Sequence, residues 1–421
     1  MPTDNLIILV LGEGAREHAL YGFNSESPSV KRVLCAPGNG GIDDCDRRRF
    51  KTYQHDVLEY VCRTEGVDLV VVGPEAPLSA GVVDFLARHG IAAFGPTQAA
   101  SILETSKAFT KLLCAEEGIP TAPFEVHENV GEAGLYIQSL AEPPVVKASG
   151  LCAGKGVVVA DSHKEAIDAA FDMLQKRIHG DAGSTIVIEK RLSGRECSVM
   201  ALCDGVNAVL LPPARDYKRV GDGDTGPNTG GMGAISPVPD VDEALLERIK
   251  EEIILPTLRA MHKRGTPFHG LLYAGIMLTE EGPMLLEYNV RFGDPETQVV
   301  LPRIESDLVP YLLATRTEGG LADLPPLQVS EDVMIGVTLA MEGYPGKYKT
   351  GVPIRQDDSP VFIAGAELRD DGMLYTTGGR IATVVAGGAT FAEAREAVYR
   401  QIEGFNFDGR FYRTDIGADV V

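Results

Sequence analysis

Short apolar runs alternate with amphipathic segments along the first hundred residues. The apolar runs have the length of buried strands and lie at residues 6–11, 30–35, 67–72 and 91–94. Helices are expected between them, one from Ala15 and one over residues 79–89. This alternation predicts an open parallel α/β sheet. Glycine-rich turns follow three of the strands, at 12–14, 37–41 and 73–75, and such sheets bind ligands beyond the carboxyl ends of their strands.

A different pattern begins at Thr97. Residues 97–118 predict one long helix that Thr97 caps and Gly118 ends, and the prolines within 119–123 predict a linker. Residues 214–234 lack periodicity and are interpreted as an ordered binding loop, with a solvated connection as the alternative. The remaining expected elements are strands at 144–148, 157–159, 184–192, 197–202, 270–279, 333–341, 361–368 and 380–386, helices at 240–264 and 390–403, and a linker at 321–326.

Composition narrows the function classes. The 421 residues allow roughly two to four domains. A net charge of -21 gives a surface that repels phosphate backbones, so no nucleic-acid partner is expected. Seven scattered cysteines without a Cys-x-x-Cys pair are interpreted as reduced thiols of a cytosolic protein. Residues 6–11 are too short to span a membrane and no export signal is visible, so we expect a cytoplasmic protein without a membrane partner.

The stretch 283–298 holds the first candidate for chemistry. It begins as an apolar strand, and side chains two apart on a strand share a face, which places Glu287 beside Asn289. A carboxylate and an amide oxygen at a strand end suit Mg²⁺, which takes its other ligands from phosphates and water. The alternative is a polar strand end that faces solvent.

A second candidate begins at Lys147, which lies inside an apolar strand. A buried lysine is costly unless it meets an anion. The small-residue loop 149–156 follows and carries three glycines and Lys155, so that it can wrap triphosphate oxygens with N–H groups and cationic ends. Its spacing is not that of a Walker A loop. A flexible hairpin tip is the alternative.

Two further segments indicate ligands more weakly. Residues 12–17 match the dinucleotide fingerprint only in part, because Glu17 replaces its third glycine. Small residues at a helix N-terminus can still bind one sugar phosphate, and a purely structural turn is an equal alternative. The polar hinge 193–196 follows the strand at 184–192 and could read a purine through backbone groups while a carboxylate takes ribose hydroxyls, although it could equally be a simple hairpin.

Several long motifs together resemble the phosphoribosylamine–glycine ligases, also called glycinamide ribonucleotide synthetases, of the ATP-grasp superfamily. They are Lys147 with 150–156, the Glu189 hinge, and the runs 224–233, 287–298, 12–19, 36–39, 72–78 and 106–111. The resemblance covers the whole chain. It implies an α/β and α+β multidomain fold with an N-terminal α/β sugar-phosphate domain at 1–104, an ATP-grasp region at 105–325 whose lid is 124–192, and a small C-terminal α/β domain at 326–421.

The resemblance also implies a reaction of early purine synthesis. ATP phosphorylates the carboxylate of glycine, the amine of 5-phosphoribosylamine attacks the resulting glycyl phosphate, and the products are glycinamide ribonucleotide, ADP and phosphate. Mg²⁺ or Mn²⁺ would assist. Glycine and 5-phosphoribosylamine are thus the expected partners, and a monomer or small homo-oligomer is expected.

The residues carried over by resemblance fall into four groups. Lys107 and Lys147 would meet the ATP phosphates, with Lys147 and Arg291 as the catalytic pair, and Arg291 would stabilise the acyl phosphate or the carboxylate of glycine. The rest of the ATP site would be Gly150, Gly154, Lys155, Gly156, Glu189, Leu192 and Glu196. Glu287 and Asn289 would hold the metal. The substrate side would be Gly12, Gly14, Arg16, Asn39, Glu75, Asn228, Thr229, Gly230, Gly231 and Arg291.

Two positions depart from the family pattern. Ser149 stands where an aspartate is usual and Cys152 where an alanine is usual, which predicts altered kinetics of the glycine-rich loop and a thiol-sensitive site if Cys152 is exposed. No general base is evident, and His18 is interpreted as structural. The rival functions are a sibling ATP-grasp ligase, a nicotinamide oxidoreductase resting on Gly12 and Gly14, and a nucleotide sensor without turnover.

Overall fold

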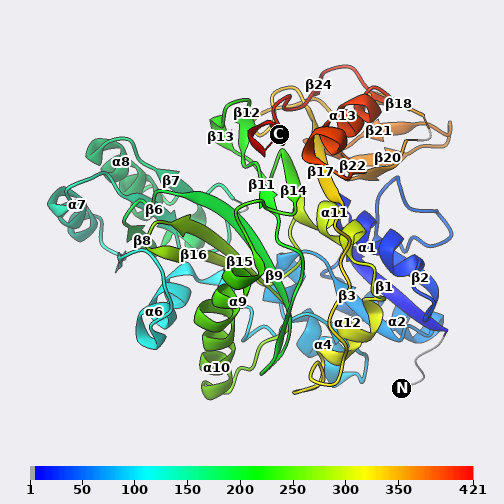
Figure 1. Cartoon of the computed structure of the whole chain (residues 1–421), viewed down its shortest axis with the longest axis horizontal. Coiled ribbons are helices and arrows are strands. Elements are labelled where there is room, and N and C mark those ends of the chain that lie inside the picture. Colours follow the sequence, from blue (N-terminus) through cyan, green and yellow to red (C-terminus); the bar gives the residue numbers. More distant parts are fainter. Residues whose placement is uncertain (1–4, 153, 358, 421) are drawn as a thin grey trace.

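The computed structural model describes residues 5–152, 154–357 and 359–420. Figure 1 shows a body of sheets and helices, with a smaller lobe that carries α7 and α8 projecting to the left and the C-terminal elements at the upper right. The predicted mixed α/β architecture is confirmed. None of the helices in the described part is long and apolar enough to cross a membrane.

The N-terminal sheet is parallel, as the alternating pattern predicts, and its strand order is β2-β1-β3-β4. Its elements are β1 (Leu6–Gly12), α1 (Ala15–Ser25), β2 (Val30–Pro37), α2 (His55–Glu65), β3 (Leu69–Val72), α3 (Glu75–Ser79), α4 (Val82–Arg88) and β4 (Ala93–Phe94). The helix predicted over 79–89 is present as α4 but begins only at Val82, because Gly81 adopts a left-handed conformation (φ 80°) that separates it from α3.

The prediction of one long helix over 97–118 is wrong. The chain forms α5 (Ile102–Thr105) and α6 (Lys107–Glu117), and extends at Ser106 between them (φ -141°, ψ 98°). The Ser106 hydroxyl then accepts a hydrogen bond from the Phe109 amide and caps α6. Gly118 ends the helix in the left-handed conformation, as predicted.

The projecting lobe is a four-stranded antiparallel sheet, in the order β5-β8-β6-β7, that packs against two helices. Its elements are β5 (Phe124–His127), α7 (Val130–Ser139), β6 (Val145–Ala148), β7 (Val157–Val159), α8 (His163–Leu174), the 3-10 turn η1 (Gly180–Gly183) and β8 (Ile186–Glu189). Ile186 and Ile188 of β8 belong to the apolar core of this lobe together with Val146 of β6.

The central sheet has the antiparallel order β10-β9-β15-β16. Its elements are β9 (Arg195–Asp204), β10 (Ala208–Leu210), α9 (Glu243–Ile249), the π-helical stretch η2 (Lys250–Ile254), α10 (Leu255–Lys263), β15 (His269–Thr279) and β16 (Gly282–Asn289). The segments α9, η2 and α10 follow one another without a break, so the helical run expected over 240–264 is present. One apolar core joins this sheet to the N-terminal domain, since Leu272 and Leu285 pack in the same cluster as Leu9.

The third body of the molecule is a six-stranded sheet that unites segments far apart in the chain. Its path is β11-β14-β17-β22-β19, with β24 paired to β17. The members are β11 (Arg215–Asp216), β14 (Gly233–Ser236), β17 (Val333–Met341), β19 (Val361–Ile363), β22 (Arg380–Gly388) and β24 (Arg410–Phe411). The stretch 214–234, expected to be a loop throughout, therefore supplies two strands of this sheet and also the hairpin of β12 (Arg219–Gly221) and β13 (Thr225–Asn228).

A smaller sheet, in the order β20-β21-β18-β23, completes the C-terminal region. The strand predicted over 361–368 is divided between the two sheets, as β19 and β20. The remaining elements are α11 (Glu296–Val300), η3 (Leu301–Arg303), α12 (Val309–Ala314), β18 (Pro353–Gln356), β20 (Ala366–Leu368), β21 (Leu374–Thr376), α13 (Phe391–Ile402), β23 (Phe405–Asn406) and η4 (Ala418–Val420).

Candidate active site

The end of β16 carries the predicted metal ligands, and a bulge sets the direction in which they point. Gly275 of β15 pairs with Glu287 and the next residue, Ile276, pairs with Leu285, so Leu286 is an extra residue. Leu285 and Tyr288 are thereby both buried in the core, while Glu287 and Asn289 are half-buried on the opposite face. The predicted juxtaposition of the carboxylate and the amide is present, although strict alternation along the strand is not.

Cations surround Glu287. Burial alone would raise the pKa of its carboxyl group, but the charges of Lys107, Lys218 and Lys147 outweigh that effect and lower the pKa below its usual value. The carboxylate is therefore ionised at neutral pH. No group of three or more His, Cys, Asp or Glu side chains forms a metal cage in the described part of the chain. Glu287 and Asn289 thus fit an ion that obtains further ligands from phosphate and water, as Mg²⁺ does.

Two lysines from different subdomains share one buried carboxylate. Glu189, at the end of β8, forms an ion pair with Lys147 of β6 and another with Lys111 of α6, whose Nζ lies 2.6 Å from Oε2. Burial lowers the pKa of Lys111. Burial would raise the pKa of Glu189, but the two lysines reverse this and lower it. Glu189 was predicted to hold adenine, yet its side chain is committed to these lysines.

The phosphate-binding candidates converge as predicted. Lys107, Lys147 and Glu287 line one small cavity together with Lys111 and Leu286. They come from α6, from β6 of the projecting lobe and from β16, so three separate elements meet at this point. The Nζ of Lys147 also donates a hydrogen bond to the Leu286 carbonyl at 3.4 Å.

Ser149 ties the glycine-rich loop to α6. Its carbonyl accepts a hydrogen bond from the Lys107 amide at 2.8 Å, and its hydroxyl accepts one from the Ala108 amide at 3.1 Å. Together with the cap by Ser106, these bonds occupy the first three N–H groups of the helix that presents Lys107. The serine that departs from the family pattern is therefore a helix cap.

The loop itself is shaped by close approaches, and Ala153 within it lies outside the described residues. A Cβ on Gly150 would lie 2.6 Å from the Cα of Ala182, and one on Gly156 would lie 2.8 Å from the Sγ of Cys152, so both positions need glycine. Cys152 is half-buried, and burial raises the pKa of its thiol. This argues against the reactive thiol that was expected if Cys152 were exposed.

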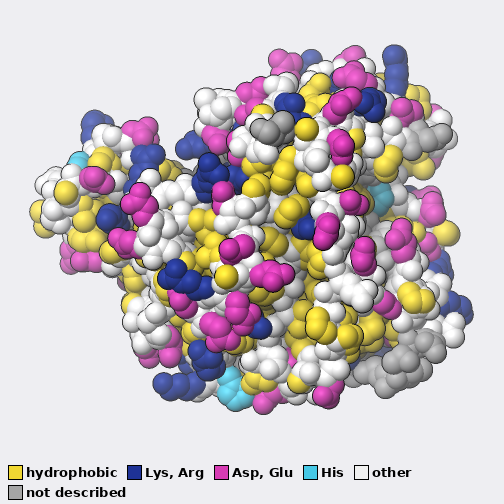
Figure 2. Space-filling model, viewed as in Figure 1, with side chains coloured by type: hydrophobic (Ala, Val, Ile, Leu, Met, Phe, Trp, Pro, Cys, Tyr) yellow, Lys and Arg dark blue, Asp and Glu magenta, His cyan; other side chains and the backbone are white. Residues whose placement is uncertain are grey.

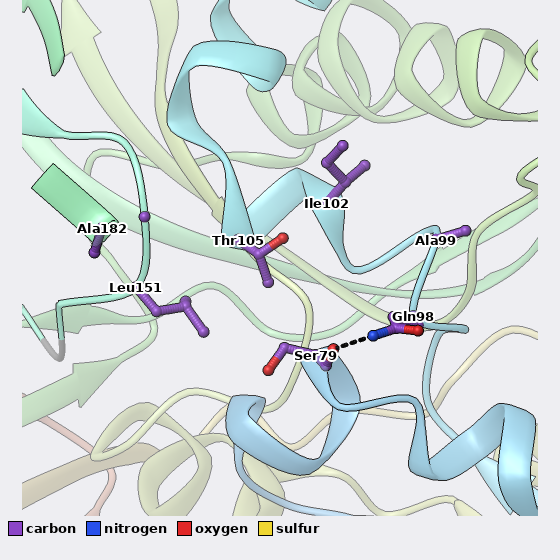
Figure 3. A pocket seen from close by; sticks show the side chains of 8 residues that line it. Ser79, Gln98, Ala99, Ile102, Thr105, Leu151 and Ala182 are labelled. Atoms are coloured by element: carbon purple, nitrogen blue, oxygen red, sulfur yellow. Dashed lines mark hydrogen bonds between the residues drawn. The ribbon is translucent and has the colours of Figure 1, made fainter. Parts of the chain in front are cut away.

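A cavity of about 500 Å³ lies beside the start of this loop. Figure 3 shows Leu151 and Ala182 on one side, and Ser79, Gln98 and Thr105 on the other, where Gln98 Nε2 donates a hydrogen bond to the Ser79 carbonyl at 2.9 Å. The cavity thus separates the loop from the N-terminal domain. On the face of the molecule in Figure 2, a notch likewise separates the projecting lobe from the C-terminal region.

The hinge after β8 leads to a charged cluster that the sequence analysis did not identify. The Nζ of Lys218 lies 2.7 Å from Oε2 of Glu196 and 3.9 Å from Oδ1 of Asp216. The side chain of Asp216 is only 9% exposed, and burial raises its pKa to about 7. Nearby, the Tyr273 hydroxyl donates to Glu296 at 2.5 Å. Glu196, the predicted ribose ligand, thus lies within a network of carboxylates around Lys218.

The turn after β1 is filled by a protein side chain. The Gly14 amide donates to Oε2 of Glu17 at 2.6 Å, and a Cβ on Gly12 would lie 2.4 Å from the Cγ of Glu17. Arg16 is buried and binds Glu17 and the Phe292 carbonyl. Asn39 donates to the carbonyls of Glu13, Gly14 and Ile363. These glycines make room for Glu17, which favours the structural alternative for the turn itself.

Arg291 follows β16 and connects the strand of the candidate metal ligands to the N-terminal domain. Its guanidinium lies 3.3 Å from Glu75 and 3.5 Å from Glu104. Burial would lower the pKa of Arg291, but Glu104 and Glu75 raise it far above its usual value. Burial would raise the pKa of Glu75, but Arg291 and Arg16 lower it.

The C-terminal region contacts the candidate substrate-binding residues through Arg380. Its Nη2 lies 2.6 Å from Oδ2 of Asp294, and its Nη1 donates to the carbonyls of Gly230 and Asp294. The Tyr344 hydroxyl accepts a hydrogen bond from the Gly230 amide at 3.1 Å. Gly231 packs against Pro295, since a Cβ there would lie 2.3 Å from the Cδ of the proline. The predicted loop 228–231 is therefore held between the Asp294 turn and the C-terminal domain, and sequence reasoning missed Arg380.

His18 is structural, as expected. Its Nδ1 accepts a hydrogen bond from the Ile363 amide at 2.9 Å, and burial lowers the pKa of the imidazole to about 4. It therefore joins α1 to β19 as a neutral ring.

Comparisons with known proteins agree over the whole chain. The family models described as the N domain, the ATP-grasp (A) domain and the C domain of phosphoribosylglycinamide synthetase match residues 6–104, 105–297 and 334–419. A phosphoribosylamine–glycine ligase of Caulobacter vibrioides is 48% identical over 98% of both chains. One from Rhizobium meliloti is 45% identical over 98% of both chains. The trifunctional purine biosynthetic protein adenosine-3 of Gallus gallus is 44% identical over 98% of this chain and 42% of its own length.

Solved structures give the same result. The crystal structure of a phosphoribosylamine–glycine ligase from Thermotoga maritima covers 98% of this chain and 100% of its own, with a TM-score of 0.85 and 34% identity. The biotin carboxylase domain of a Hydrogenobacter thermophilus 2-oxoglutarate carboxylase, in complex with MgADP and bicarbonate, covers 96% of this chain and 91% of its own. Its TM-score is 0.73 and its identity 15%, so it shares the fold.

Proposed function

This chain belongs to the phosphoribosylglycinamide synthetase family, and from that premise we infer that it is an ATP-dependent ligase that joins glycine to 5-phosphoribosylamine. The γ-phosphoryl group of ATP passes to the carboxylate of glycine, which gives ADP and glycyl phosphate. The amine of 5-phosphoribosylamine attacks the carbonyl carbon, phosphate leaves, and the nitrogen loses a proton. Glycinamide ribonucleotide is the product, in a step of purine biosynthesis.

One observation carries the assignment of the reaction centre: Lys107, Lys147 and Glu287 meet at a single cavity. Transfer of a phosphoryl group requires fixed positive charge around its oxygens. Two lysines beside a carboxylate provide that charge together with a place for a cation. We assign the phosphate-binding role to Lys107 and Lys147, with Gly150, Gly154, Lys155 and Gly156 as the loop that covers the phosphates.

The nucleoside is assigned to the hinge. Because the carboxylate of Glu189 is committed to two lysines, we propose that adenine is held by the backbone between Glu189 and Leu192. Glu196 lies at the start of β9, beyond this hinge, and is assigned to the ribose hydroxyls.

The metal is assigned to Glu287 and Asn289. ATP-grasp enzymes use ATP with a divalent metal, and we propose Mg²⁺ because both side chains offer hard oxygen ligands. When bound, the ion neutralises phosphate charge as the phosphoryl group is transferred. The protein keeps the Glu287 carboxylate ionised and directs it toward the lysines.

The sugar phosphate and glycine are assigned to the region around Arg291. Glu75, Arg16 and Asn39 lie on the N-terminal side, and Asn228, Thr229, Gly230 and Gly231 lie on the other. Gly12 and Gly14 shape the turn around Glu17. Arg291 is the proposed ligand of the acyl phosphate or of the carboxylate of glycine. We also propose domain boundaries after residues 104 and 325, with 124–192 as the lid. The family models for the N and A domains meet between residues 104 and 105, which supports the first boundary, and the second boundary falls between the A-domain model, which ends at 297, and the C-domain model, which begins at 334.

The test is ADP release from ATP and Mg²⁺, with glycine and freshly made 5-phosphoribosylamine supplied separately and together. Release that requires both substrates is expected. Glu287→Gln should lower the rate by at least about 100-fold, the size of effect seen when an electrostatic stabiliser of the transition state is removed. Lys176→Met, which breaks an exposed ion pair with Asp172 in the lobe of α8, is the matched control and should leave the rate unchanged. Release with a different carboxylate in place of glycine would overturn the substrate assignment.

A further inference from the structure

Oxygen atoms of the protein surround the ammonium group of Lys111. It is 2% exposed, and its Nζ lies 2.6 Å from Glu189 Oε2, 2.6 Å from Thr121 Oγ1 and 3.5 Å from the Leu285 carbonyl. The ammonium group donates hydrogen bonds to Thr121 and Leu285 and forms an ion pair with Glu189, so three oxygen atoms enclose it. Lys111 borders the cavity of Lys107 and Lys147, but its contacts with Glu189, Thr121 and Leu285 hold its ammonium group to the protein.

Lys147 differs in this respect. Its Nζ forms an ion pair with Oε1 of Glu189 and donates a hydrogen bond to the Leu286 carbonyl, and these are its two polar contacts among the described residues. Like Lys111, it lines the cavity that Lys107 and Glu287 share. The carboxylate that holds Lys147 is the same one that Lys111 binds.

The charge of this buried unit follows from its members. Two lysines and one carboxylate carry a net charge of +1. Lys147 presents part of this positive charge to the cavity. Without Lys111, Glu189 and Lys147 would form a neutral pair, and the carboxylate would hold Lys147 against the attraction of a phosphate. A buried charge is weakly screened, so this change of one unit acts strongly at short range.

The unit also crosses the boundary between the lid and the body. Lys147 and Glu189 lie on β6 and β8 of the lid sheet, whereas Lys111 lies on α6 and reaches Leu285 of β16. Lys111 is thus one of the contacts between the body and the lid sheet, and it reaches Lys147 through Glu189.

We propose that Lys111 is a positioning residue for phosphoryl transfer, which acts through Glu189 to fix Lys147 and to keep its charge available to the phosphates of ATP. This inference rests on the proposed function, because it takes Lys147 as a ligand of the nucleotide. The role belongs to the charge of Lys111 and not only to its bulk.

The test measures the dissociation constant of MgATP by calorimetry, together with KM for ATP and kcat. Lys111→Met is expected to weaken ATP binding by roughly 10- to 100-fold, the range for loss of one charge-assisted contact. Lys111→Arg should bind within about threefold of the wild type, because it keeps the charge. Lys111→Gln keeps polarity without charge and should resemble Lys111→Met; it carries the comparison if Lys111→Met does not fold. Lys176→Met is again the control.

A double variant separates charge from structure. Lys111→Met combined with Glu189→Gln leaves Lys147 as the sole charge of the unit and restores +1, so it should bind ATP more tightly than Lys111→Met alone. A merely structural role predicts the opposite, since two buried contacts are then lost. Equal binding by wild type and Lys111→Met, or weaker binding by the double variant than by Lys111→Met, would overturn the inference. Failure of the wild type to bind MgATP would instead reject the proposed function.

Discussion

The contact between Arg380 and Asp294 gives the sharpest prediction for substrate binding. Arg380→Met removes a 2.6 Å ion pair and the hydrogen bonds that Nη1 donates to the carbonyls of Gly230 and Asp294. Breaking a fully buried pair costs about 3–5 kcal/mol. The two side chains are 21% and 15% exposed, so we expect about 1–3 kcal/mol after allowance for solvent screening. Asp294 keeps its hydrogen bond from Gln298, which limits the damage.

Part of that energy should appear in the substrate site, because Gly230 lies in the loop assigned to the sugar phosphate. If about 1–2 kcal/mol is lost from binding, KM for 5-phosphoribosylamine rises roughly 5- to 30-fold. KM for ATP should change less than about twofold, since Lys107 and Lys147 make no contact with Arg380. Steady-state kinetics with each substrate varied in turn measures both values, and urea unfolding measures the stability.

A second arginine of the same domain provides the control. Arg400 forms an exposed pair with Glu396 one turn away on α13, and such pairs contribute little. Arg400→Met should therefore change neither KM nor stability. If Arg380→Met lowers stability but leaves KM for 5-phosphoribosylamine unchanged, the C-terminal domain has no part in the substrate site. An equal rise in both KM values would mean that the whole site is disturbed.

Three further outcomes are expected. Burial raises the pKa of Asp216 to about 7, so between its usual pKa and about 7 the folded protein binds more protons than the unfolded chain and loses stability as pH rises. The free energy of unfolding of Asp216→Asn, relative to the wild type, should therefore be more favourable at about pH 8 than at about pH 5.5, by about 1–2 kcal/mol. Urea titrations measure this difference, and equal values at the two pH values would contradict the prediction. Arg413 is 1% exposed and binds Asp224 and Asp415, so Arg413→Met should cost about 2–4 kcal/mol and speed proteolysis of the β12–β13 hairpin, followed by mass spectrometry. Ser149→Ala removes the cap on the Ala108 amide and should cost about 1 kcal/mol; unchanged hydrogen exchange at that amide would refute the assigned cap.

The sequence pattern was enough to predict an element where burial of that element's own apolar residues is what mainly stabilises it. The strands at Leu6–Gly12 and Val333–Met341 are continuous apolar runs, and both were predicted within one residue at each end. The position of Glu287 and Asn289 on one face of the same strand was also predictable. Side chains two apart at a strand end share a face whatever the rest of the fold. The glycines of the loop after Lys147 predict a cradle for phosphate, whereas the close approaches of Gly150 to Ala182 and of Gly156 to Cys152 are visible only in the structure.

Distant partners explain the errors. The break at Ser106 depends on Ser149, which lies more than forty residues away and caps the second helix. The strand Gly233–Ser236 pairs with the two-residue strand Arg215–Asp216 on one side and depends on Val333–Met341, about a hundred residues later, on the other. The lysine partners of Glu189 could not be predicted, since no spacing connects them. Asp216 and Lys218 were missed although they are two residues apart beside a short strand, where a shared face could have been recognised.

The pairing of β14 with β17 determines how this chain can be divided. Ala234 and Ile235 cover an edge of β17 that would otherwise present unpaired N–H and C=O groups, and Ile335 and Val337 on that strand are completely buried. A fragment that starts near residue 330 would retain β17 and β22 but lose the strand beside them. Exposed apolar edges of this kind pair with other chains. The C-terminal domain is therefore continuous in sequence but does not form its sheet without an earlier strand. A chimera that takes this domain from a relative should take residues 214–236 from the same relative.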